Sequence, residues 1–222
     1  MRRFWLVVAG LMAVAFGGHA PSQALTYRLV PYDDGRCQPD CPSAIFASGA
    51  ISGREAEEFA WFFRQSASRH RLLKLLVIHS PGGNAYGGMA LGSLVRSNQV
   101  TVVVGQSGGE ILTPLGGFLP GLCGSACVFV LAGGVRRIVP EGSVVAVHSA
   151  RQVQTEFHDV VTGTRETLSH DKGEVARMFG SFYSKMGVNP GLATLGEETP
   201  HSDARVLTPA ELKRYRLVLG KL

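Results

Sequence analysis

The sequence lacks the features that mark several large functional classes. It has no basic run interleaved with aromatic residues, so its charge pattern does not favour a nucleic-acid-binding or membrane-surface protein. It contains no internal repeat and no sign of a second domain. Charged residues make up only 18% of the chain and hydrophobic residues 45%, which excludes a disordered protein. With 222 residues, the chain is long enough for one domain with a sizeable core.

A hydrophobic run long enough to span a bilayer is also missing. The apolar segment at residues 4–16 is short for a transmembrane helix, which makes an uncleaved membrane anchor the weaker alternative. Two arginines precede this segment and the small residue Ala24 follows it, a pattern that predicts a signal peptide at residues 1–24. Cleavage removes two arginines and no acidic residue, so the net charge falls from +5 to +3. We therefore expect an exported, periplasmic protein consisting of residues 25–222.

Cysteines are few, and their spacing is informative. The four cysteines form two pairs of equal spacing, Cys37 with Cys41 and Cys123 with Cys127. An exported chain meets an oxidising compartment, so disulfides are expected. Four cysteines allow three connectivities, and closeness in the chain favours pairing within each pair. A four-thiolate zinc site is the alternative, but the usual two-residue spacing within each pair is absent.

Strands and helices alternate through most of the chain. Apolar periodicity predicts strands at residues 27–30, 45–47, 72–78, 100–104 and 144–147, and helices at residues 54–68, 86–96 and 168–186, with a short helical turn at 191–196. Thr208, Pro209 and Glu211 predict an N-cap, a first-position proline and a capping box for a last helix. We expect a stapled loop at residues 33–42, a long loop at 105–122 and an exposed ribbon or hairpin at 151–165. The alternation of strands with helices, together with strands made mainly of apolar residues, predicts an α/β fold whose parallel strands are buried on both faces.

Residues 123–134 combine small residues with a following apolar run, and Ser125 is their only hydroxyl. The pattern predicts a turn that leads into a buried helix, with Ser125 at its N-terminus. Free N–H groups and the positive end of the helix dipole favour the negative charge of an attacked carbonyl oxygen. The structural alternative is that Ser125 is an ordinary N-cap.

Two further elements suit a serine nucleophile, which needs a base and oxyanion donors. His148 ends an apolar strand 23 residues after Ser125, and Gly82 and Gly83 follow a strand, where they can turn backbone N–H groups toward a ligand. The structural alternative for His148 is an ordinary histidine, either exposed or with its ring nitrogens hydrogen-bonded. The structural alternative for Gly82 and Gly83 is a tight turn without a binding role. Five other histidines lack comparable placement or partners in the pattern: His70, His79, His158, His170 and His201.

Several segments together resemble the Clp protease proteolytic subunit of the crotonase-like superfamily, and more closely its exported, periplasmic relatives. The resemblance covers most of residues 25–222. Its carriers are Ile45-Phe46-Ala47-Ser48-Gly49, Ile78-His79-Ser80-Pro81-Gly82-Gly83 with Gly88-Met89, Gly124-Ser125-Ala126 with Ala132-Gly133, Val147-His148-Ser149, and Leu207-Thr208-Pro209-Ala210-Glu211. The resemblance implies a single α/β domain built as a spiral of β-β-α units.

The resemblance also implies site residues. Ser125 is the expected nucleophile, His148 the general base, and the N–H groups of Gly83 and Ala126 the oxyanion hole. The family's aspartate lies just before the Leu-Thr-Pro-Ala-Glu segment, where Asp203 is displaced by one residue; Glu197 and Glu198 are alternatives. The chain departs from the family in its long 105–122 loop and in the cysteine pair around Ser125, which would brace the nucleophile turn.

The sequence thus predicts an exported serine hydrolase that cleaves peptides through an acyl-serine intermediate. No metal or organic cofactor is implied, and export disfavours a coenzyme-A reaction. Expected partners are a peptide or unfolded-protein substrate and further copies of the chain, with no nucleic acid and no ATP-driven unfoldase. The alternatives are a catalytically inactive binding or scaffold protein on the same fold, and a non-proteolytic esterase or thioesterase.

Overall fold

The structure is a computed structural model that describes residues 23–33, 35–37, 40–108, 112, 118–150, 155–158, 165–168 and 172–220. The predicted signal peptide, apart from its last two residues, lies outside the described residues. Ala24 forms an isolated bridge with Ala50 beside the first strand.

The larger sheet carries most of the predicted strands. Its order is β1-β2-β3-β4-β5, with β7 also paired to β4. The strands are β1 (Thr26–Pro31), β2 (Ser43–Ser48), β3 (Leu72–His79), β4 (Thr101–Ser107), β5 (Phe118–Pro120) and β7 (Arg137–Ile138). Strands β2, β3, β4 and β7 run parallel, whereas β1 and β5 pair antiparallel with β2 and β4.

A second, three-stranded sheet continues from the first and carries the candidate site. It contains β6 (Leu122–Gly124), β8 (Val144–Val147) and β11 (Arg205–Val206), in the order β11-β8-β6. Strands β6 and β8 are parallel. The residue after β3, Ser80, joins the two sheets, because its N–H donates to Leu122 and its carbonyl accepts from Gly124.

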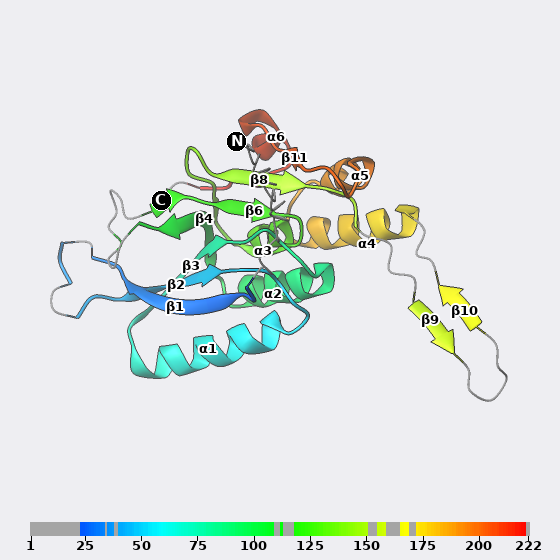
Figure 1. Cartoon of the computed structure of the whole chain (residues 1–222). Helices are drawn as coiled ribbons and strands as arrows, with labels where there is room; N and C mark the ends of the chain where they lie inside the picture. Colours follow the sequence, from blue (N-terminus) through cyan, green and yellow to red (C-terminus); the bar gives the residue numbers. More distant parts are fainter. Residues whose placement is uncertain are drawn as a thin grey trace, which may run out of the picture.

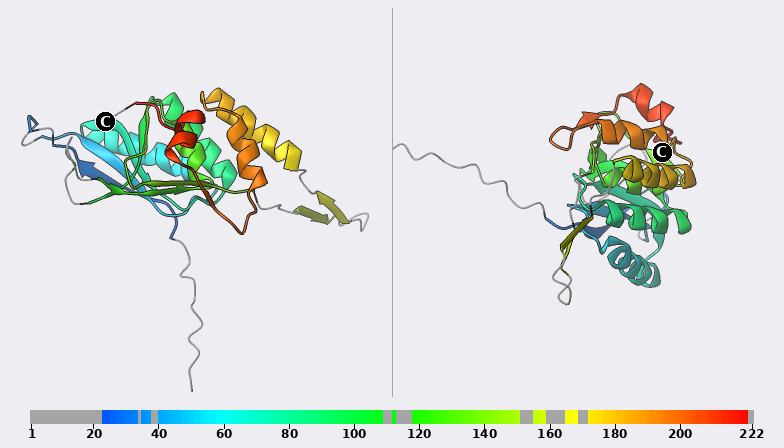
Figure 2. Two further views of the ribbon diagram at one scale, coloured as in Figure 1. Left: turned by 90° about the horizontal axis from the view of Figure 1, so that it is seen from above. Right: turned by 90° about the vertical axis from the view of Figure 1, so that its right-hand side faces the viewer.

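The helices lie on one side of the strands, as the two views in Figure 2 show. They are α1 (Glu55–Arg69), α2 (Ala85–Ser97), α3 (Cys127–Gly133), α4 (Lys172–Lys185), α5 (Gly191–Glu198) and α6 (Pro209–Arg214). A two-stranded antiparallel hairpin of β9 (Thr155–His158) and β10 (Arg165–Leu168) extends beyond α4 (Figure 1). Among the described residues, no helix combines the length and the apolar character needed to cross a membrane.

Apolar side chains bury both faces of the larger sheet. Along β3, Leu76 and Ile78 join the core beneath the helices, while Leu75 and Val77 join a smaller core on the opposite face. Such continuous apolar strands are typical of parallel sheets covered on both sides. The predicted single α/β domain with strands buried on both faces is confirmed.

Helices α2 and α3 pack closely through glycine. Gly88 faces the Ala126 carbonyl and Gly92 faces the Phe129 carbonyl, and neither position leaves room for a Cβ atom. The small-residue character of the predicted 86–96 helix therefore has a packing reason. This contact places the start of α2 directly against the segment that holds Ser125.

Two sequence-based boundaries were wrong. The long loop predicted at 105–122 is partly sheet, because β4 continues to Ser107 and residues 118–120 form β5 antiparallel to it. The helix predicted from residue 168 begins at Lys172, because residues 165–168 pair with β9 as strand β10. In both places a segment becomes a strand because it pairs with another segment. The periodicity of apolar residues within one segment does not show which other segment it pairs with. The hairpin predicted at 151–165 is confirmed, but its second strand lies at Arg165–Leu168, beyond the predicted end.

Candidate active site

Ser125 occupies a sharp turn between strand β6 and helix α3. Its φ angle is +51°, in the left-handed region, which costs a non-glycine residue about 1–2 kcal/mol. Its N–H donates a 2.8 Å hydrogen bond to the Ala146 carbonyl, and its own carbonyl accepts from Val128 at 2.9 Å. Strained non-glycine residues of this kind gather at functional sites, and a serine on a strand-turn-helix elbow presents its hydroxyl at the apex.

The structural alternative for Ser125, an ordinary N-cap, is wrong. The N-cap of α3 is Ala126, and no side chain caps this helix. Within the described part of the chain, the Ser125 hydroxyl makes no hydrogen bond, and the residue is half-buried. A strained serine with an unbonded hydroxyl has no evident structural purpose.

A disulfide brackets the elbow. Cys123 and Cys127 are bonded, with their Cα atoms 5.2 Å apart, and both are fully buried. The predicted pairing within the 123–127 pair is therefore confirmed. The bond joins the middle residue of β6 to the first residue of α3, so the turn between them is covalently closed around Ser125.

Gly82 and Gly83 form the neighbouring turn, between β3 and α2. Their φ angles are +102° and +139°, which other residues rarely adopt. A Cβ atom on Gly82 would lie 2.7 Å from the Ser125 Cβ and 2.9 Å from the Ala126 nitrogen. Ile51 holds the far side of the turn, since it donates to the Gly82 carbonyl and accepts from Asn84, both at 2.8 Å.

The backbone N–H groups of Gly83 and Ala126 are the expected oxyanion donors. Within the described residues, neither the Gly83 N–H nor the Ala126 N–H donates a hydrogen bond. Ala126 is 1% exposed, and buried backbone N–H groups are nearly always paired. Unpaired N–H groups on the residue after a serine and on an adjoining glycine turn suit an oxygen that carries negative charge.

His148 follows β8, beside the elbow. Because Gly124 and Ala146 are partners in parallel strands, Ser125 and His148 emerge from the same edge of the smaller sheet. The His148 Nδ1 atom lies 2.8 Å from the Ser149 carbonyl oxygen. A carbonyl only accepts, so Nδ1 carries a proton, and in the neutral ring Nε2 then keeps its lone pair. That tautomer is the one a general base needs, although no hydrogen bond joins the ring to the Ser125 hydroxyl in the described residues.

The segment after His148 is held by the chain that follows α5. The Ser149 N–H donates to the Thr199 carbonyl at 2.8 Å, and the Ala150 N–H donates to Glu197 Oε1 at 3.1 Å. His201 Nδ1 lies 3.0 Å from the Ser149 carbonyl oxygen. The rings of His148 and His201 meet edge to face, with their centroids 4.6 Å apart and their planes at 82°.

The prediction that His79 and His201 lack partners was wrong. His201 shares an acceptor with His148, and His79 Nδ1 accepts from the Leu122 N–H at 3.0 Å. His201 is 53 residues from His148 in the chain, and only the antiparallel pairing of β11 with β8 brings its loop back. No local sequence signal identifies such a contact.

None of the three candidate carboxylates contacts the His148 ring in the described residues. Asp203 is exposed, and its N–H donates to the Pro200 carbonyl at 2.9 Å. Glu198 is also exposed, and Glu197 binds the backbone of Ala150. The assignment of Asp203 as the acid behind His148 stays a prediction.

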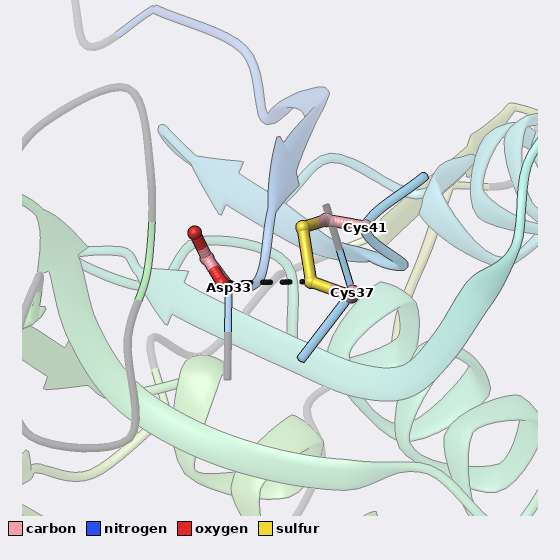
Figure 3. Close-up of side chains that lie close together, drawn as sticks. All are labelled: Asp33, Cys37 and Cys41. Atoms are coloured by element: carbon pink, nitrogen blue, oxygen red, sulfur yellow. Dashed lines mark hydrogen bonds between the residues drawn. A yellow bond between two sulfur atoms is a disulfide. The ribbon is translucent and has the colours of Figure 1, made fainter. Parts of the chain in front are cut away.

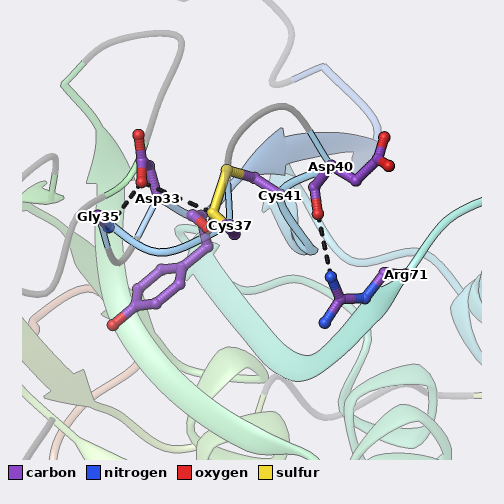
Figure 4. Close-up of a disulfide and its surroundings, with 7 residues drawn as sticks. Asp33, Gly35, Cys37, Asp40, Cys41 and Arg71 are labelled. Carbon is purple, nitrogen blue, oxygen red and sulfur yellow. Dashed lines mark hydrogen bonds between the residues drawn. A yellow bond between two sulfur atoms is a disulfide. The ribbon is translucent and has the colours of Figure 1, made fainter.

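The other cysteine pair lies far from the elbow, at the loop after β1. Cys37 and Cys41 form a disulfide with Cα atoms 4.7 Å apart, and Asp33 Oδ1 lies 3.6 Å from the Cys37 sulfur (Figure 3). Arg71 donates to the Asp40 carbonyl at 3.1 Å and ties this loop to the start of β3 (Figure 4). The possible metal-ligand atoms of Asp33, Cys37 and Cys41 lie within 4.8 Å of one another. Because the two cysteines are joined in a disulfide, neither offers a thiolate to a metal ion. Since all four cysteines are paired, the four-thiolate zinc alternative is wrong.

No protein-family model matches the chain, and no curated protein matches it. Two solved structures with a related backbone arrangement are substituted forms of the 1510-N membrane-bound stomatin-specific protease, the second in complex with a substrate peptide. Both are 18% identical in sequence. The first comparison covers 79% of this chain and 75% of the other, with a TM-score of 0.45. The second covers 79% and 71%, with a TM-score of 0.46.

Proposed function

We propose that this chain is a serine hydrolase that cleaves peptide bonds, with Ser125 as nucleophile and His148 as general base. One observation carries the proposal: Ser125 has a positive φ and, among the described residues, its hydroxyl makes no hydrogen bond and the N–H groups of Ala126 and of Gly83 in the adjoining turn donate none. A scaffold gains nothing from that strain, whereas a nucleophile does.

In the first half of the reaction, Ser125 Oγ attacks the substrate carbonyl carbon while His148 Nε2 takes the hydroxyl proton. The N–H groups of Gly83 and Ala126 bind the resulting oxyanion. His148 then returns the proton to the leaving amine, the C–N bond breaks, and the acyl-serine ester remains. His148 then takes a proton from water, whose oxygen attacks the ester carbon; the bond to Ser125 Oγ breaks, His148 returns the proton to Oγ, and the acid leaves. The hydroxyl and the ring reach hydrogen-bond distance in the substrate complex, as is common for catalytic pairs that are loose when unliganded.

The peptide substrate rests on the resemblance of the Gly124-Ser125-Ala126 and Val147-His148-Ser149 segments to Clp-type proteases. Short or unfolded peptides are the proposed substrates, and no ATP-driven partner takes part. An esterase or thioesterase would use the same residues. Turnover of small esters without any cleavage of peptides would favour that second activity.

We also propose that the protein is exported. Two disulfides fit an oxidising compartment, and the basic, apolar and small-residue pattern of residues 1–24 fits a cleaved signal peptide. N-terminal sequencing of the protein recovered from the periplasm should begin at Leu25. Recovery of the uncleaved chain in the membrane fraction would contradict the proposal.

Self-association through α4 is a further part of the proposal. Phe179 on this helix packs on Phe129 of α3, with ring centroids 4.8 Å apart, while Arg177 and Ser181 are exposed. The exposed side of α4 is the proposed contact between copies. Light scattering across protein concentrations should show an assembly, and a strict monomer would refute it.

The test of the catalytic proposal is labelling of residues 25–222 with a fluorophosphonate, which reacts with activated serines. We expect labelling that Ser125→Ala and His148→Ala abolish. Ser93→Ala is the matched control, because Ser93 is an exposed serine on α2 that bonds only its own helix. Folding of each variant is checked by thermal melting. A folded, oxidised protein that stays unlabelled at every concentration would favour the inactive binding protein.

A further inference from the structure

We propose that the peptide group between Ser149 and Ala150 takes the place of the acid behind His148, and that Glu197 and His201 are the positioning residues that hold it. This inference rests on the proposed function of Ser125 and His148. It assigns the third position of the catalytic arrangement to backbone atoms rather than to Asp203.

One peptide group makes all the relevant contacts. Its oxygen, on Ser149, lies 2.8 Å from His148 Nδ1 and 3.0 Å from His201 Nδ1. Its N–H, on Ala150, donates to Glu197 Oε1 at 3.1 Å. A carbonyl oxygen has two lone pairs, so it accepts from both imidazoles at once. The group is therefore held on its nitrogen side by a carboxylate and on its oxygen side by two rings.

The arrangement orients the base. Rotation of this peptide group would move its oxygen away from His148 Nδ1, and the contacts with Glu197 and His201 both oppose that rotation. Ser149 is 6% exposed, and its own N–H donates to the Thr199 carbonyl. The preceding peptide group, between His148 and Ser149, is therefore held in place as well. The result is a His148 ring held in the Nδ1–H tautomer, with Nε2 free for the serine proton.

The arrangement also supplies negative charge indirectly. The Glu197 carboxylate polarises the peptide group through its N–H, which makes the Ser149 oxygen a stronger acceptor for His148. When His148 becomes positively charged during the reaction, that stronger acceptor stabilises the imidazolium. Asp203 makes no side-chain contact of this kind within the described residues.

The experiment compares second-order rates of fluorophosphonate labelling in four folded variants. Glu197→Gln keeps an acceptor for the Ala150 N–H but removes its negative charge, and His201→Leu removes one donor to the Ser149 carbonyl. Each should slow labelling about 10-fold, the upper range for one ordinary hydrogen bond. His201→Asn should recover much of the loss, because its side-chain amide can donate to the same carbonyl. Asp203→Asn should label at close to the unsubstituted rate.

Two readouts separate a positioning role from a loss of folding or of chemistry. Thermal melting identifies variants that fail to fold, and Glu197→Gln, which keeps side-chain size, remains informative if His201→Leu does not fold. Imidazole ¹⁵N NMR should find the Nδ1–H tautomer of His148 in the unsubstituted protein, whether or not it is active. A slow Asp203→Asn with normal Glu197→Gln and His201→Leu, or an Nε2–H tautomer of His148, would overturn the inference. Absence of any Ser125 labelling together with the Nδ1–H tautomer would refute the proposed function instead.

Discussion

The Ser125 N–H and the Ala146 carbonyl are joined by a 2.8 Å hydrogen bond, one residue beyond the last paired position of β6. This bond extends the parallel ladder between β6 and β8 into the elbow. It fixes Ser125 relative to β8, the strand that directly precedes His148. The distance between the candidate nucleophile and the candidate base therefore depends on the pairing of two short strands.

The positive φ of Ser125 predicts a conflict between stability and activity. Ser125→Gly should be more stable than Ser125→Ala by about 1–2 kcal/mol, because glycine adopts φ of +51° without strain. Urea unfolding measures the difference, and both variants should be unlabelled. Gln99→Gly relieves the same type of strain at φ of +57° away from the site and should be stabilised with labelling intact. Equal stability of the two Ser125 variants would show that the elbow is not strained.

Gly82→Ala should damage the site and the fold together. The added methyl group would lie 2.7 Å from the Ser125 Cβ, and alanine would have to adopt a φ of +102°. The Gly82 turn and the Ser125 elbow must therefore move apart. We expect a loss of about 1–3 kcal/mol in unfolding free energy and a severe loss of fluorophosphonate labelling. Gly53→Ala is the matched control, because a Cβ there has no atom within 4 Å. Normal labelling of Gly82→Ala would show that the Gly82 turn does not form part of the site.

The two disulfides should differ in their effect on labelling. Replacing Cys123 and Cys127 by alanine should cost about 2 kcal/mol for the short closed loop, and it frees the elbow that holds Ser125. Replacing Cys37 and Cys41 opens a loop of the same length far from the site. We expect only the first pair of substitutions to slow labelling, with both losses of stability measured by denaturation. Slow labelling in both would point to a general loss of folding.

The capping box of α6 predicts an acid-sensitive contribution to stability. The Thr208 N–H, the Arg205 guanidinium and the Thr208 hydroxyl bond the Glu211 carboxylate and lower its pKa from 4.5 to about 2. The folded pKa lies below the unfolded one, so the stabilisation is present above pH 4.5 and is lost as the pH falls toward 2. Glu211→Gln should lower the melting temperature at neutral pH, and the difference should vanish near pH 2. A difference that persists unchanged in acid would contradict the ionised capping box.

Much of the architecture was predictable because it depends on neighbours in the chain. The strand at 72–78, the helix at 54–68 and the capping box at Thr208 all formed where apolar periodicity and cap residues placed them. The pairing of Cys123 with Cys127 followed from their closeness in the sequence. Short strands such as β6 escaped prediction, because three residues carry too little periodicity and depend on partners elsewhere in the chain.

The sequence by itself determined the local part of the candidate site: a serine in a small-residue turn before an apolar helix, a histidine at a strand end, and two glycines after β3. Only the tertiary structure decided what surrounds His148. The Ser149–Ala150 peptide group meets Glu197 and His201 because β11 returns antiparallel to β8 and carries the preceding loop with it. Contacts between segments about 50 residues apart follow from the packing of whole elements, since no periodicity or spacing within either segment specifies its partner.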